Sequence, residues 1–129
     1  MKPHAKDINR LIESLREEMT QYGELLALMQ EQQALILSQQ SRELLANSNE
    51  VNGQMVNIKT ARQAREKARV ALATHLGAPQ ETTIRQITGY LPEEYRPLLA
   101  ALVDEINALP QNVHVWLRQN DLMMKRSLN

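Results

Sequence analysis

The chain has 129 residues, 43% of them hydrophobic, which suits one domain over residues 1–129 with a modest core. Fifteen Lys and Arg balance fifteen Asp and Glu, so no net charge draws the protein to nucleic acid or to an anionic membrane. The absence of cysteine excludes disulfides and thiolate chemistry. No stretch reaches the roughly 18 uninterrupted apolar residues of a membrane span, so we expect a soluble, cytoplasmic protein.

The first predicted element is a long helix from Ile8 to Leu37, in a chain whose composition favours helix nearly throughout. Five apolar residues recur one heptad apart without a miss, namely Ile8, Leu15, Tyr22, Met29 and Ile36. This spacing predicts about 30 helical residues, or about 45 Å. We expect Asp7 to cap the helix. The opposite face should be solvated and carries Arg10, Glu13, Glu17, Glu24 and Glu31.

A second long helix is predicted after a turn at Ser38–Ser41, with Ser41 as its N-cap, although a break at Asn47–Asn49 competes with this choice. Gly77 and Pro79 should end the helix. Small residues dominate the later part of its seam and bury little area, so we expect that part to be the less stable. The predicted seam is Leu44, Leu45, Val51, Met55, Ile58, Ala61, Ala64, Ala68, Ala71, Leu72 and Leu76.

The stretch Lys59–Arg69 within this helix holds five basic residues against Glu66 alone. One interpretation is contact with RNA or an acidic partner. The other is a solvated helix face, partly balanced by the acidic surface of the first helix. We favour the second because no aromatic side chains interleave with the charges to stack on bases.

The connector that follows should contain a short helix with Ile84, Ile87 and Leu91 on its apolar side. Thr82 or Thr83 can cap it and Gly89 can end it. Pro92 and Pro97 each suit a first helical turn, so irregular turns should follow the helix. We expect the connector to lie across the bundle as a lid.

The third long helix should begin near Pro97 and continue through Pro110 to about Ser127. The apolar stripes before and after Pro110 share one helical phase, which independent helices have no reason to keep. We therefore predict a single helix, kinked at Pro110 by the lost hydrogen bond and the ring clash. The fold class is all-α, an antiparallel bundle of three long helices with a short connecting helix.

The last eighteen residues, Asn112–Asn129, carry apolar side chains on two faces of the predicted helix. Such a helix can bury one face against its own protein and offer the other to a partner. Burial of both faces in the core is the competing interpretation. One face holds Val113, Trp116, Leu117, Asn120, Met123, Met124 and Leu128, and the opposite face holds Val115 and Leu122.

Several stretches together resemble the FlgN family of flagellar type III export chaperones. They are EQQAL from Glu31, the second helix opening near Ser41, its ending at Leu76 and Gly77, and the terminal WLRQNDLMMKRSL. The segment from Asn120 to Leu128 is similar to the family's Asn-x-x-Leu ending. The resemblance spans nearly the whole chain, which differs from the usual pattern at Pro110 and in its Asn-rich opening of the second helix.

The resemblance implies a cytoplasmic chaperone that binds the C-terminal helices of hook-filament junction proteins and delivers them to the flagellar export gate. A client helix would lie in a groove beside the last helix, with Trp116 as its largest anchor. Asn120 would hold register by a hydrogen bond across helices, or else lie at the surface. The residues expected to bind the partner are Val113, Val115, Trp116, Leu117, Asn120, Leu122, Met123, Met124 and Leu128.

Two other functions stay open, namely export of a different flagellar substrate and a coiled-coil adaptor that dimerises along the Ile8 heptads. Catalysis finds no support, and no cofactor or metal site is expected. His4, His75 and His114 lie in different segments, and the pairs Glu17-Glu18 and Glu93-Glu94 diverge by 100° as solvated residues do.

Overall fold

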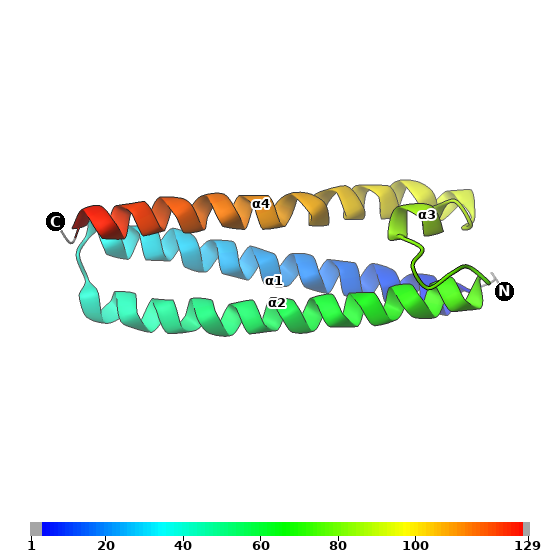
Figure 1. The fold of residues 1–129 in the computed structure, drawn as a ribbon, viewed down its shortest axis with the longest axis horizontal. Helices are drawn as coiled ribbons and strands as arrows, with labels where there is room; N and C mark the ends of the chain where they lie inside the picture. Colours follow the sequence, from blue (N-terminus) through cyan, green and yellow to red (C-terminus); the bar gives the residue numbers. More distant parts are fainter. Residues whose placement is uncertain (1–3, 128–129) are drawn as a thin grey trace.

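The computed structural model describes residues 4–127 as four α-helices and one 3₁₀ turn, without strands in that range (Figure 1). Each long helix runs opposite to the one before it. This confirms the predicted all-α bundle. Within the same range, no helix combines the length and apolarity needed to cross a membrane. The elements are α1 (Ala5–Leu37), α2 (Ser41–His75), α3 (Ile84–Thr88), η1 (Glu93–Tyr95) and α4 (Arg96–Ser127).

Helix α1 is the central element, and its predicted heptads form the interior. All five heptad residues from Ile8 to Ile36 are buried, and the charged face predicted opposite them is exposed. Since this stripe is covered within the chain, it offers no surface for a coiled coil with a second copy. The predicted cap was wrong: the helix begins two residues before Asp7, after His4, and Asp7 instead lies beside the ring of His75.

The turn between α1 and α2 lies where it was predicted, without a break at Asn47–Asn49. Gln39 adopts the left-handed conformation there, with φ of 56°. Ser41 is the first residue of α2, and Gln40 occupies the N-cap position without a side-chain hydrogen bond, so the predicted Ser41 cap was wrong. At the other end Gly77 takes φ of +72°, a conformation that favours glycine, which confirms the predicted stop.

The buried side of α2 is more polar than predicted. Asn47 and Gln54 are buried beside Val51 and Ile58, whereas Leu45 is 67% exposed and the predicted seam residue Ala64 is also exposed. Asn47 donates to the backbone oxygen of Leu28 at 3.0 Å, and Gln54 donates to that of Gln21 at 2.9 Å. The hydrogen bonds to α1 satisfy the amide nitrogens of both side chains, although Oδ1 of Asn47 is buried without a partner among the described residues.

The connector contains the predicted short helix, capped by Thr83. The Thr83 hydroxyl accepts from the backbone of Gln86 at 3.2 Å, while the Gln86 side chain accepts from the backbone of Thr83 at 2.9 Å, which completes a capping box. Ile84 and Ile87 are buried against the start of α4. The connector therefore closes one end of the bundle and does not lie across its length as a lid.

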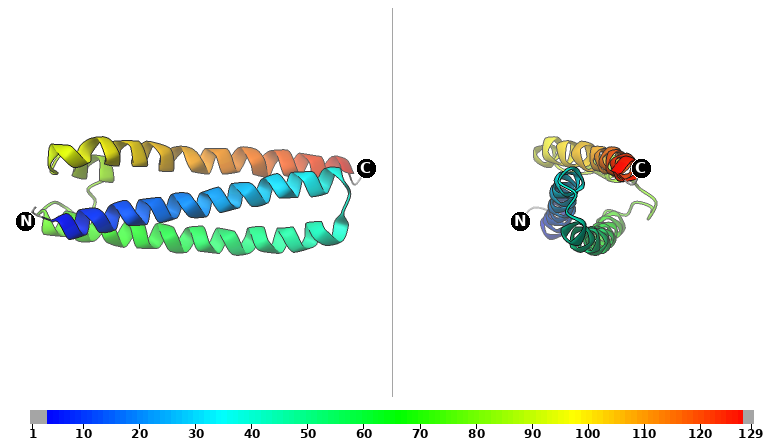
Figure 2. Two further views of the ribbon diagram at one scale, coloured as in Figure 1. Left: turned by 180° about the vertical axis from the view of Figure 1, so that it is seen from behind. Right: turned by 90° about the vertical axis from the view of Figure 1, so that its left-hand side faces the viewer.

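Helix α4 continues through Pro110 to Ser127, as predicted. It packs along α1, as α2 does, but α2 and α4 hardly pack on each other. Seen end-on, α1 lies at an apex from which α2 and α4 diverge (Figure 2, right). Two helices are therefore held by one, and the side between them is left for other elements.

Two apolar clusters lie along this bundle. The proximal cluster, at the end that holds α3, joins all four helices through Ile8, Leu11, Ile12, Leu15, Ala68, Leu72, Ala73, Ile84, Ile87, Leu91, Leu99, Leu102, Val103 and Ile106. The distal cluster, towards the α1–α2 turn, contains Tyr22, Leu25, Met29, Val51, Ile58 and Val113. Because α3 contributes to the proximal cluster alone, the two ends of the bundle differ in how completely they are filled.

Candidate partner-binding groove

A groove follows the seam between α2 and α4 over the distal part of the bundle. One hollow of about 490 Å³ is walled by Met55 of α2 and Leu117 of α4. A second, of about 390 Å³, also reaches Met55 and has Tyr22 and Leu25 of α1 at its base. A third shares Met124 with the first and ends at Ser41 and Ser127. The hollows therefore adjoin one another along the whole distal seam.

The groove has apolar side chains in both walls. Leu44 and Met55 come from α2, and Leu117 and Met124 come from α4. Met55 and Leu117 are each 37% exposed, and Leu44 and Met124 are partly buried. Apolar surface on facing walls, with an apolar base below, is the arrangement that binds an amphipathic helix.

Two of the predicted partner-binding residues are used by the fold itself. Val113 is buried in the distal cluster. Asn120 is 1% exposed and donates to the backbone oxygen of Met29 and to Oε1 of Gln32, both at 2.9 Å. Gln33 donates to Oδ1 of Asn120 at 3.4 Å. Asn120 therefore holds the register of α4 on α1 within the chain, and its burial leaves it inaccessible to a partner.

The other predicted residues divide among three sides of α4. Leu117 and Met124 line the groove. Trp116 is mostly buried against the distal cluster, and Met123 is also partly buried; neither lines a hollow of the groove. Leu128 lies outside the described residues. The predicted opposite face is the exposed back of α4 and holds Val115 at 43% and Leu122 at 50% exposed.

The α2 wall is the part of the groove that sequence reasoning missed. Leu44 and Met55 were assigned to a buried seam, and Ser48 and Asn52 were not assigned. A signal did exist, because Asn47 and Gln54 share the helical phase of Val51 and Ile58. When Asn47 and Gln54 face α1, Met55 faces the α4 side of α2.

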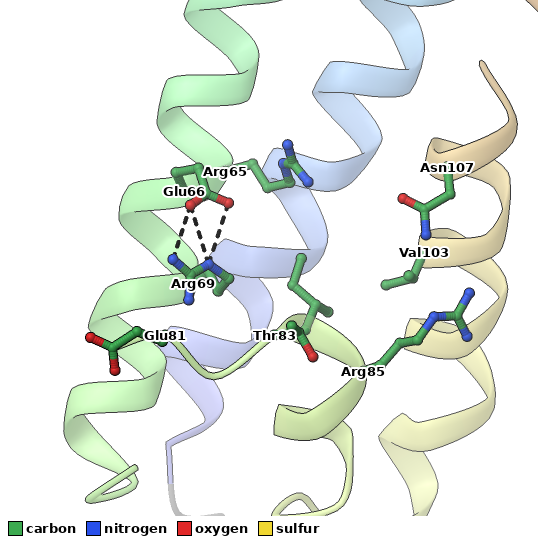
Figure 3. A pocket seen from close by; sticks show the side chains of 9 residues that line it. Arg65, Glu66, Arg69, Glu81, Thr83, Arg85, Val103 and Asn107 are labelled. Atoms are coloured by element: carbon green, nitrogen blue, oxygen red, sulfur yellow. Dashed lines mark hydrogen bonds and ion pairs between the residues drawn. The ribbon is translucent and has the colours of Figure 1, made fainter. Parts of the chain in front are cut away.

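The basic stretch Lys59–Arg69 is largely engaged within the chain. Arg62 donates to the Tyr22 hydroxyl at 2.6 Å, and Arg65 lies 2.8 Å from Oε1 of Glu18. Arg69 donates to Glu66 at 2.9 Å and to the backbone oxygens of residues 80 and 82, which fastens the connector to α2. Figure 3 shows Arg65, Glu66 and Arg69 together on α2, facing Val103 and Asn107 of α4 across a hollow.

Glu18 corrects the prediction that the Glu17-Glu18 pair is solvated. It is 1% exposed and faces Arg65 of α2. Burial raises the pKa of its carboxyl, and attraction to Arg65 and Arg62 opposes this rise. The nearby Glu66 behaves oppositely, because the hydrogen bond from Arg69 lowers its pKa. The Glu18–Arg65 pair thus lies inside the α1–α2 interface.

No group of three or more His, Cys, Asp or Glu side chains within residues 4–127 is arranged to hold a metal ion. His75 and Asp7 do meet, joining the end of α2 to the start of α1. Because the ring is more than half exposed and no third His, Cys, Asp or Glu of residues 4–127 joins the pair, we assign it to the packing of the two helices.

Comparison with known proteins identifies one family. The family model described as "FlgN protein" matches residues 1–129, the whole chain. No curated protein and no solved structure matches. The match confirms the resemblance that the terminal segment and the helical patterns indicate.

Proposed function

Because the chain belongs to the FlgN family, a family of non-catalytic flagellar export chaperones, we propose that it holds the C-terminal helix of a hook-filament junction protein in the groove. The observation that carries this proposal is the incomplete filling of the space between α2 and α4. At the proximal end the chain places its own α3 in that space, with Ile84 and Ile87 buried, and the hollow that remains beside α3 is lined mostly by charged and polar side chains. Distally it supplies no such element among the described residues.

The groove has the size and chemistry of a site for one helix. From Pro110 to Ser127, α4 advances about 26 Å, which matches a partner helix of about 17 residues. Apolar residues at i, i+3, i+4 and i+7 of the partner would meet Leu44 and Met55 on one wall and Leu117 and Met124 on the other. Two of these are methionines, whose flexible side chains adapt to different partner shapes.

The benefit to the client follows from covering its apolar stripe. An isolated amphipathic helix exposes a contiguous apolar surface, which promotes aggregation. We propose that the complex forms in the cytoplasm and that the chaperone then delivers the client to the export gate. The binding step rests on the groove, and delivery rests on membership of the family.

Matched glutamate substitutions test the groove as the binding site. Met55→Glu and Leu117→Glu place a charge in the two walls, whereas Val56→Glu and Val115→Glu place it on neighbouring exposed positions. We expect the groove variants to lose client binding in co-purification from a flagellated cell extract, and the neighbours to keep it. All four positions are at least 37% exposed, so each variant should stay folded by circular dichroism.

The same experiment separates the alternatives. If Val115→Glu loses the client and Leu117→Glu keeps it, the exposed back of α4 is the binding face and the groove assignment is wrong. If another flagellar export substrate is captured in place of a junction protein, that substrate is the client of the groove. Removal of residues 112–129 is a poorer test, because it also removes Val113 and Asn120 from the interior.

Delivery needs a separate measurement. We expect a strain that carries Met55→Glu to release less junction protein into the medium than wild type, with the Val56→Glu strain unaffected. Normal release by a variant that no longer binds the client would contradict a role in delivery.

A further inference from the structure

We infer that the helix held in this groove carries acidic side chains along both flanks of its apolar stripe. The inference rests on the proposed function, since it concerns the chemistry of the same partner. It predicts that the groove selects its occupant by the sign of its charge as well as by apolar shape.

The first observation is a set of cations in facing walls. Lys59 and Arg62 of α2 line one hollow, Arg118 of α4 lines the next, and the two hollows share Met55. Lys59 and Arg118 form no ion pair among residues 4–127, whereas Arg62 donates to the Tyr22 hydroxyl and is also attracted to the buried Glu18. The apolar centre of the groove is therefore bordered on both sides by unneutralised positive charge.

The groove lacks free negative charge of its own. Asp121 is the one carboxylate that lines these two hollows, and it lies 3.0 Å from Nζ of Lys125. This contrasts with the outward face of α1, where Glu17, Glu24 and Glu31 are exposed and no Lys or Arg occurs from residue 17 to residue 37. The chain is neutral as a whole, so the positive groove reflects how its charges are distributed.

The proximal end shows how the same space is filled when the occupant is part of the chain. There α3 places Ile84 and Ile87 between α2 and α4 and pairs its Arg85 with Asp104 of α4. At that end α4 supplies the anion, Asp104, and α3 supplies the cation, Arg85. In the distal groove α4 supplies the cation Arg118, so a partner helix would form the corresponding ion pair with a carboxylate.

Two other occupants fit less well. A second copy could present the acidic face of α1, but that face carries no apolar stripe to fill the groove. A nucleic acid would suit the cations, yet Tyr22 is 3% exposed and offers no face for stacking, which leaves the single small ring of His114 as the aromatic side chain exposed in the two hollows. An acidic amphipathic helix meets both the charge and the apolar requirement.

The test uses two synthetic 18-residue helical peptides with the same apolar stripe and with flanks of either glutamate or lysine. We expect the glutamate peptide to bind the full-length protein more tightly by fluorescence anisotropy, and its affinity to fall as salt is added. Arg118→Glu and Lys59→Glu should each weaken its binding about fivefold, from the loss of one attraction and the gain of one repulsion. Together the two changes should favour the lysine peptide.

Lys67→Glu is the matched control, because Lys67 is exposed on α2, lines none of the groove hollows and forms no ion pair within residues 4–127. It should leave both affinities unchanged.

Equal binding of the two peptides, with both lost in Met55→Glu, would overturn this inference while leaving the proposed function intact. Binding of neither peptide would overturn both. Displacement of the glutamate peptide by polyuridylate, or concentration-dependent dimerisation that blocks it, would assign the positive groove to another occupant and overturn the inference.

Discussion

The proximal and distal parts of the bundle solve the same packing problem with different chemistry. The proximal cluster draws fourteen apolar residues from four helices and the connector, whereas the distal cluster draws six from three helices. The distal interior adds buried amides, those of Gln32, Asn47, Gln54 and Asn120. Burial of apolar side chains stabilises the fold but does not fix how far one helix slides along another. A buried amide does fix this position, because its hydrogen bonds form in only a few geometries. The distal part therefore keeps its helices aligned although one side is open.

Truncating a buried leucine in each cluster should separate the two regions most clearly. Leu99→Ala in the proximal cluster should lower the free energy of unfolding by about 4 kcal/mol, because a closed cavity remains. Leu25→Ala should cost about 2.5 kcal/mol, because Leu25 borders the groove and its site can relax into that space. Urea unfolding monitored by circular dichroism measures both. Equal costs would mean that the open groove does not relieve the distal packing.

Trp116→Ala tests whether the largest side chain of the distal region serves packing or partner binding. Trp116 is mostly buried against the distal cluster, so its removal should cost about 3 kcal/mol of stability, the low end of the range for a core tryptophan. Client affinity, measured by titration at a temperature where the variant is folded, should change little. A large loss of affinity without loss of stability would move the binding face from the groove to the Trp116 side of α4.

Asn120→Ala should show what the distal amides contribute. The change removes the hydrogen bonds to Met29, Gln32 and Gln33 and should destabilise the protein by about 1 to 2 kcal/mol. Asn112→Ala, at an exposed position of the same helix, is the control and should have little effect. An unchanged unfolding midpoint for Asn120→Ala would show that packing alone aligns α4 on α1.

Glu18 gives the smallest effect, which is visible only as a dependence on pH. Because burial raises its pKa in the folded state, folding favours the protonated form, and the contribution of Glu18 to stability declines as pH rises through the raised pKa. Glu18→Gln lacks this titration. The variant should therefore gain stability relative to wild type between pH 4 and pH 8 in urea unfolding. A relative loss over that range would mean that the Arg65 attraction exceeds the cost of burial.

Local patterns in the sequence were sufficient for most of the fold. The Ile8 heptads, the Thr83 cap, the Gly77 stop and the shared phase across Pro110 each depend on neighbours within a few turns, and each is confirmed. Glu18 was missed because its partner Arg65 is distant in the sequence, so a two-glutamate pair looked like a solvated surface. Tertiary pairing of this kind has no local periodicity.

The groove was only half predictable for a related reason. Excess apolar surface on α4 was visible in the sequence, and Leu117 and Met124 do line the groove. Which of the flanking residues face it depends on the rotation of α4 on α1, which the buried Asn120 sets. Which residues of α2 face the groove depends in turn on the burial of Asn47 and Gln54, which were expected at the surface because they are polar.

The arrangement in which α1 binds both other long helices, while these barely touch, has a mechanical consequence. At the proximal end α3 fixes the distance between α2 and α4. At the distal end, a tilt of α2 or α4 on α1 would change their spacing without breaking an extensive interface between them. Clients whose side chains differ in bulk would then be accommodated by a change of spacing, while the buried amides keep α2 and α4 from sliding along α1.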